Sequence, residues 1–86
     1  MTEQNSPRDA AGEDTRRAIA AVKEILDGRD PQGDFAAVMV TLEHAVAVAL
    51  LAVMGRQPRK AAALLNEGLA PGVERRLSHY EARRAP

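Results

Sequence analysis

The sequence predicts an all-α protein: a small bundle of three to four helices around a central hydrophobic helix, preceded by a disordered N-terminal tail. The first observation is an apolar stretch over residues 35–54 that only Thr41, Glu43 and His44 interrupt. The second is that apolar residues recur at helical spacing on both sides of this stretch. The third is that no pair of alternating apolar runs indicates a β-hairpin.

The composition leaves this chain with little material for a core. Its 86 residues include no cysteine, no Trp, one Phe and one Tyr. Disulfides, thiolate metal sites and aromatic bulk are therefore not available as stabilisers. Much of the 45% hydrophobic content is alanine, which buries little area per residue. Small domains with thin cores are commonly stabilised by oligomerisation.

Residues 1–13 are polar and without periodicity, so we expect a disordered tail there and a single helical domain over residues 14–86. The first helix is expected to run from Asp14, a favoured N-cap, to Asp27, with Gly28 in the left-handed conformation. Its apolar stripe comprises Ala18, Ile19, Val22, Ile25 and Leu26.

Residues 28–33 have the composition of a turn. Asp34 is then expected to cap a second helix that continues to Met54 and stops at Gly55. At 100° per residue, one face of this helix should form the intrachain core. That core comprises Phe35, Val38, Leu42, Val46 and Val53.

A third helix is expected from Pro58, a residue suited to a first helical turn, to Glu67. Gly68 would end it in the left-handed conformation, and Pro71 would start a fourth helix. The alternative is one helix kinked at Pro71.

The opposite face of the second helix carries Val40, His44, Val48 and Leu51. The other helices offer one apolar stripe each, and we expect the core face to absorb them. This opposite face would then stay uncovered, which a monomer seldom tolerates. We therefore expect a homodimer or higher oligomer through these four residues, with another protein as the alternative partner. The remaining alternative is that the third and fourth helices wrap the second within one chain.

His44 would lie in that interface, where a charge change near neutral pH could affect assembly. The simpler interpretation is that the His44 ring packs in the interface, with one nitrogen hydrogen-bonded to a carbonyl oxygen. Glu43 points about 100° away from His44 on a helix, so the two side chains cannot bind one metal ion within one chain without other ligands. No spacing of His, Asp or Glu residues resembles a metal-binding motif, and we expect neither a metal nor a cofactor.

Arg56, Arg59 and Lys60 surround the start of the third helix. Together with free helix-start N–H groups, these cations form a candidate anion-binding site for phosphate or carboxylate. The alternative is a solvated loop, and no Walker-type motif indicates a nucleotide.

The sequence therefore predicts a non-enzymatic interaction or assembly module, since no nucleophile motif or acid pair is recognisable. The alternative is a nucleic-acid-binding regulator that uses the basic C-terminal helices, with Arg75, Arg76, Arg83 and Arg84. The formal net charge of zero makes nucleic-acid binding the weaker prediction.

We expect a cytoplasmic protein without a membrane span. The absence of cysteine fits a reducing compartment, and Met1–Ala11 lacks the apolar run of a secretory signal. The apolar stretch is long enough to cross a bilayer. However, Glu43 and His44 lie at its middle, where ionisable groups are costly in lipid.

Overall fold

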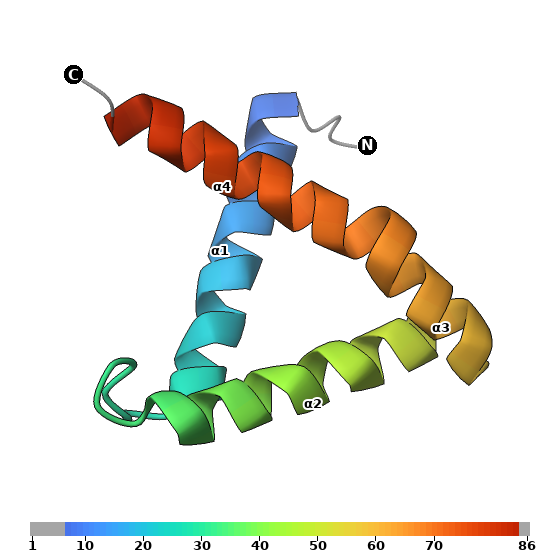
Figure 1. The fold of residues 1–86 in the computed structure, drawn as a ribbon. Coiled ribbons are helices and arrows are strands. Elements are labelled where there is room, and N and C mark those ends of the chain that lie inside the picture. Colours follow the sequence, from blue (N-terminus) through green and yellow to red (C-terminus); the bar gives the residue numbers. More distant parts are fainter. Residues whose placement is uncertain (1–6, 85–86) are drawn as a thin grey trace, which may run out of the picture. The chain divides into compact units, whose positions relative to one another are not determined.

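The computed structural model describes residues 7–84, and every regular element in that range is helical (Figure 1). The elements are α1 (Pro7–Leu26), α2 (Phe35–Val53), α3 (Pro58–Leu64), a π-helical turn η1 (Leu65–Leu69) and α4 (Ala70–Arg84). The predicted all-α class is confirmed. The chain divides into two compact units, Met1–Leu42 and Glu43–Pro86, and α2 continues from the first into the second.

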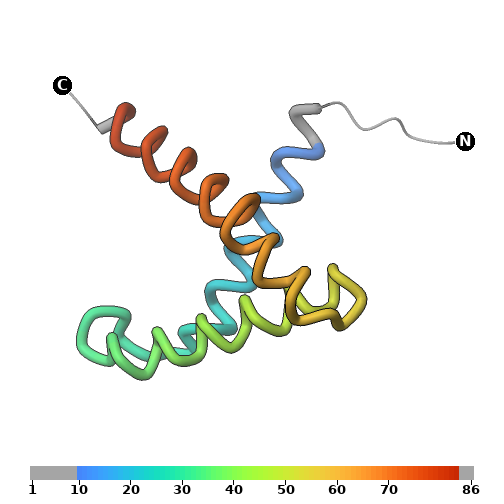
Figure 2. The backbone as a smooth tube through the Cα atoms, turned by 45° about the vertical axis from the view of Figure 1, so that its right-hand side comes forward, coloured from blue at the N-terminus to red at the C-terminus, as the bar shows by residue number. Residues whose placement is uncertain are grey.

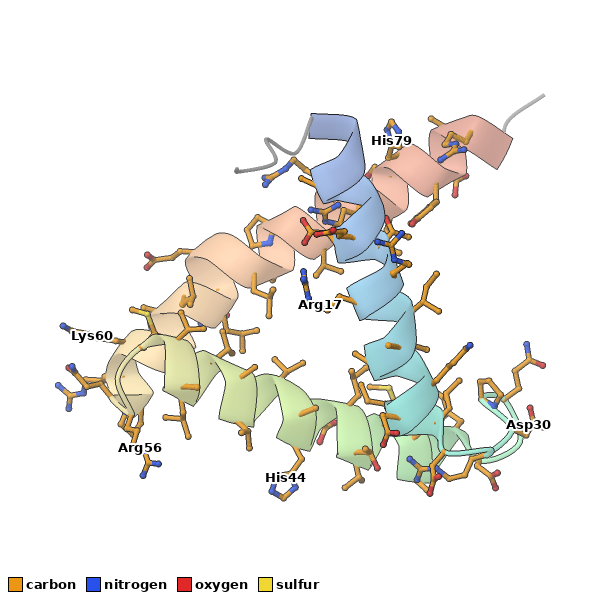
Figure 3. All side chains as sticks on the ribbon, turned by 180° about the vertical axis from the view of Figure 1, so that it is seen from behind. Arg17, Asp30, His44, Arg56, Lys60 and His79 are labelled. Atoms are coloured by element: carbon orange, nitrogen blue, oxygen red, sulfur yellow. The ribbon has the colours of Figure 1, made fainter. Side chains whose placement is uncertain are left out.

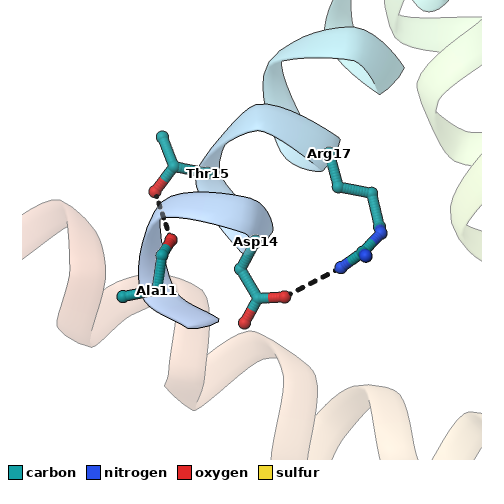
Figure 4. A network of polar contacts seen from close by, with 4 residues as sticks. All are labelled: Ala11, Asp14, Thr15 and Arg17. Atoms are coloured by element: carbon teal, nitrogen blue, oxygen red, sulfur yellow. Dashed lines mark hydrogen bonds and ion pairs between the residues drawn. The ribbon is translucent and has the colours of Figure 1, made fainter. Parts of the chain in front are cut away.

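Helix α1 begins at Pro7, earlier than the predicted start at Asp14. Proline is well placed in a first helical turn because its missing N–H has no partner there. Asp14 is consequently not an N-cap. Its carboxylate instead forms an exposed ion pair with Arg17, 2.9 Å away (Figure 4). The remainder of the predicted tail, residues 1–6, lies outside the described residues.

The end of α1 follows the prediction closely. Asp27 and Gly28 both have positive φ angles, 48° and 77°. The Asp27 N–H still donates to the carbonyl of Lys23 at 2.8 Å. Left-handed residues at this position turn the chain out of the helix axis, and glycine adopts that conformation at no steric cost.

Asp30 organises the turn between α1 and α2. Its carboxylate accepts hydrogen bonds from the N–H groups of Gln32 (3.2 Å) and Gly33 (3.0 Å). Asp34 lies immediately before α2, and its carbonyl accepts the N–H of Val38 as an N-cap carbonyl does. The Asp34 carboxylate, however, accepts the N–H of Asp30, so it closes the turn rather than capping the helix with its side chain.

Helix α2 ends where the sequence predicts. Gly55 and Arg56 both have positive φ angles, 62° and 64°. The Arg56 N–H donates to the carbonyl of Leu51 at 2.7 Å, which satisfies one of the free carbonyls at the helix end. The chain then reverses into α3, which begins at Pro58.

The predicted break at Gly68 is wrong. Gly68 has no positive φ, and helical structure continues from α3 through η1 into α4 (Figure 2). The Ala70 N–H bonds to the carbonyl of Leu65, five residues back, instead of four. Pro71 explains this widened turn, since its ring crowds the carbonyl four residues back and it donates no hydrogen bond. The structure is thus closer to the single-helix alternative.

The predicted core is largely wrong. Across residues 10–83, whose side chains are described, only Leu50 and Ala61 are buried, with 8% and 7% of their surface exposed. Phe35, Leu42 and Val53 were expected inside and are exposed. Val38 and Val46 are half-buried. Much of the apolar stripes of α1 and α4 is exposed as well. Their exposed members include Ile19, Val22, Val73 and Leu77.

Candidate interaction surface on α2

The face predicted to mediate self-association is open to solvent. Val40 and Val48 expose 61% and 59% of their surface. His44 is exposed and projects away from the helix (Figure 3). Leu51 is half-buried, and it lies near the end of α2 next to the buried Leu50. All four residues are therefore accessible on one side of a regular helix.

This face contains no charged side chain. Ala37 precedes Val40 on this side of the helix and Ala47 follows His44, and both alanines are exposed. Glu43 borders this face, about 100° around the helix from His44 and about 40° from Ala47. An uncharged strip that mixes small and branched apolar side chains can pack closely against another helix.

The other side of α2 is unevenly covered. Met39 and Val46 are half-buried and Leu50 is buried, whereas Phe35 and Val53 at the two helix ends are exposed. This second apolar face is thus partly occupied along its middle. The Val40–Leu51 face has more continuous exposure.

Arg29 fixes the beginning of α2 to the end of α1. Its guanidinium donates to the carbonyls of Ile25 and Leu26 and to the hydroxyl of Thr41, at 3.0 Å for the latter two. A cation is electrostatically favourable at a helix C-terminus. Sequence reasoning missed this residue, although a cation directly after the helix-ending Gly28 was an available signal.

The three candidate anion-binding residues are exposed at the turn between α2 and α3. Arg56 and Lys60 project into solvent from this region (Figure 3), and Arg59 lies beside them in the first turn of α3. No ion pair involves them within the described residues. Helix α3 has no acidic residue in its first turn, and Gln57 makes no side-chain capping bond. Whether these residues bind an anion stays a prediction.

A partly open hollow lies on α4, and half of its lining residues are arginines. The lining residues are Gly72, Arg75, Arg76, His79, Tyr80 and Arg83. Arg75, His79 and Arg83 follow one another at intervals of four residues and therefore share one side of the helix. This surface belongs to the predicted nucleic-acid alternative.

Among the described residues, no group of three or more His, Asp or Glu side chains is arranged to hold a metal ion. One helix in the described range, α2, is long and apolar enough to cross a membrane. This statement rests on the length and composition of the helix alone. Core helices of soluble proteins and signal sequences can be as long and as apolar.

Comparison with known proteins adds no relative: the chain matches no family model, no curated protein and no solved structure. The fold and the surface define the class as an all-α protein with an exposed apolar helix face.

Proposed function

We propose that this protein is a non-enzymatic assembly module that associates with itself through α2. The observation that supports the proposal most directly is the exposure of Val40 and Val48 at 61% and 59% on a strip without charge. Burying such side chains contributes about 25 cal/mol per Å² of apolar surface removed from water. A second copy supplies a surface of matching chemistry, and two-fold dimers are the commonest oligomers.

Stability gives a second reason for self-association. With only Leu50 and Ala61 buried across residues 10–83, one chain removes little apolar area from water. The entropy cost of ordering a chain is about 1–2 kcal/mol per residue for the backbone alone. Association would supply additional burial, as it does for many small proteins that lack disulfides and metals.

A membrane is the competing environment for α2, and two ionisable residues argue against it. Glu43 and His44 occupy the middle of the helix, where an unpaired ionisable group is unfavourable in hydrocarbon. We propose that α2 is covered by protein, and that the protein functions in the cytoplasm.

A matched pair of substitutions tests which face of α2 associates. Ala47 and Ala49 are both exposed, lie two residues apart and differ mainly in the face they occupy. Ala47→Glu places a carboxylate on the Val40–Leu51 face and should weaken association by about tenfold or more. The longer side chain replaces a methyl group at a close contact, and the carboxylate loses its hydration on burial. Ala49→Glu should leave the oligomer intact. The readout is sedimentation equilibrium, with circular dichroism to verify helix content in both variants.

Three results would contradict this proposal. Loss of association from Ala49→Glu alone would move the interface to the opposite face. A monomeric unmodified protein would remove self-association altogether. Stable partitioning of the unmodified protein into neutral phosphatidylcholine vesicles would assign α2 to the membrane.

Nucleic-acid binding is a second candidate, supported by the basic lining of the hollow on α4. Phosphate contacts release counterions, so such binding weakens steeply with salt. A gel-shift titration at two salt concentrations tests it, with Arg75→Glu/Arg83→Glu as the variant expected to lose binding. The zero net charge and the intervening Glu74 and Glu81 make it the weaker candidate.

A further inference from the structure

We infer that two copies of α2 pair antiparallel, with Val40 of one copy opposite Leu51 of the other. This inference rests on the proposed self-association and specifies its geometry. It comes from the spacing of residues on the exposed face, from their sizes, and from the charges at the two ends of the helix.

Six residues along the Val40–Leu51 side of α2 have the spacing of a coiled-coil seam, and Val48 lies beside them. They succeed one another at alternating intervals of three and four, as in a seven-residue repeat. The members of this seam are Ala37, Val40, His44, Ala47, Leu51 and Met54. Helix α2 is continuous from the first of these residues to Leu51. Met54 follows the last residue of α2 and is half-buried, and its N–H still donates to the carbonyl of Leu50 at 3.0 Å.

The side-chain sizes along the seam favour antiparallel pairing. When Val40 faces Leu51 of the second copy, His44 faces Ala47 and Ala37 faces Met54. A large residue then meets a smaller one in every layer, which fills space without voids or overlap. Parallel pairing would instead set His44 against His44 and leave alanine against alanine at residues 37 and 47.

The charges at the ends of α2 favour the same direction. Asp30 and Asp34 are exposed at its start, and Arg56, Arg59 and Lys60 are exposed beyond its end. In the inferred pair, the start of each α2 lies beside the end of the other, so the acidic turn before one helix comes near the basic turn that follows the other. Antiparallel pairing therefore brings unlike charges together, and it also opposes the two helix dipoles.

These charged groups are available for contacts between copies. Among the described residues, the ion pair present joins Asp14 and Arg17. The charged residues at the two ends of α2 therefore take part in no ion pair within this part of the chain. Arg29, the nearest cation in sequence to Asp30, is engaged with two carbonyls and Thr41. The turn hydrogen bonds leave each carboxylate with unused acceptor capacity.

Cysteine cross-linking tests the direction and register. The sequence contains no cysteine, so Val40→Cys and Leu51→Cys each introduce a single thiol. In the inferred pair, an oxidised mixture of the two variants forms the 40–51 disulfide. Neither variant links to itself, because identical residues lie about 16 Å apart along the axis at 1.5 Å per residue. Sedimentation of each reduced variant reports whether the dimer is retained.

The outcomes separate this inference from the proposed function. Self-linking of both variants would establish parallel pairing, and self-linking of one variant alone would establish an antiparallel pair in a different register. An associated protein without any 40–51 link would place the contact elsewhere. Each of these results would overturn the inferred geometry and leave self-association in place. A monomeric unmodified protein would overturn the inferred geometry and the proposed function together.

A charge variant gives an independent test that does not alter the seam. Arg59→Glu/Lys60→Glu places acidic residues in the first turn of α3, where they suit the helix dipole. Antiparallel pairing predicts about tenfold weaker association at low salt, with the difference shrinking at high salt. Unchanged or tighter association at low salt would overturn the inferred geometry. In a parallel pair the like-charged ends already repel each other, and the change lowers the charge on each of them.

Discussion

The guanidinium of Arg29 donates a hydrogen bond to the hydroxyl of Thr41 at 3.0 Å, across a separation of twelve residues in sequence. The same guanidinium binds the carbonyls of Ile25 and Leu26 at the end of α1. Thr41 in turn donates to the carbonyl of Ala37 within α2, at 3.3 Å. One part-buried side chain thus joins the end of one helix to the side of the next.

Arg29→Ala should therefore lower the free energy of unfolding by about 1–3 kcal/mol, since hydrogen bonds to charged groups contribute about that much. The measurement is chemical denaturation followed by circular dichroism. Thr41→Val is the matched control, because it removes one acceptor and keeps the shape, and it should cost less. A double variant that loses the full sum of both single effects would show that the two residues are not coupled.

Glycine substitutions should act in opposite directions at two positions. Gly28 has a φ of 77°, so Gly28→Ala should destabilise the protein by about 1 kcal/mol. Gly12 lies inside α1 with open space where a Cβ would be added, so Gly12→Ala should stabilise it by about 0.5–1 kcal/mol. Thermal denaturation measures both changes. Equal shifts in one direction would contradict the assigned backbone conformations.

Asp30→Ala should loosen the turn before α2, because the N–H groups of Gln32 and Gly33 lose their acceptor. The expected loss is about 1 kcal/mol, with faster amide hydrogen exchange at residues 32 and 33. Asp30→Asn keeps one acceptor oxygen in place of two, so it should retain the protection of one of the two amides. If both variants exchange alike, the side chain of Asp30 does not hold this turn.

His44→Leu should tighten self-association by about tenfold, or about 1.4 kcal/mol. The reason is that a polar residue at a central seam position lowers coiled-coil stability, and leucine removes that cost. Sedimentation equilibrium of both proteins at one pH measures the change. Leu42→Ala, on the other side of α2, is the control and should leave the association constant unchanged.

Sequence reasoning predicted α2 well because its limits are set locally. Asp34, Gly55 and the apolar run between them are signals within a few residues of each helix end. The left-handed Gly28 followed from similar local chemistry. The start of α1 was harder to predict from the sequence, since residues 7–13 lack an apolar stripe and Pro7 suits a loop as well as a first helical turn.

Gly68 shows where a local signal misled. A glycine followed by a proline normally marks a helix end, yet the chain accommodates Pro71 through one π turn at residues 65–69. The burial pattern was harder still to predict. Periodicity identifies which residues share a face of α2, but it does not determine which face its own chain covers, so Phe35 and Val53 were wrongly placed in the core.

The most direct measurement is the molar mass of the unmodified protein by sedimentation equilibrium over a range of concentrations. One chain has a mass of 9.2 kDa. Self-association through α2 predicts a mass at least twice that value, falling toward the single-chain value on dilution. A mass of one chain at every concentration, with helix content intact, would contradict it.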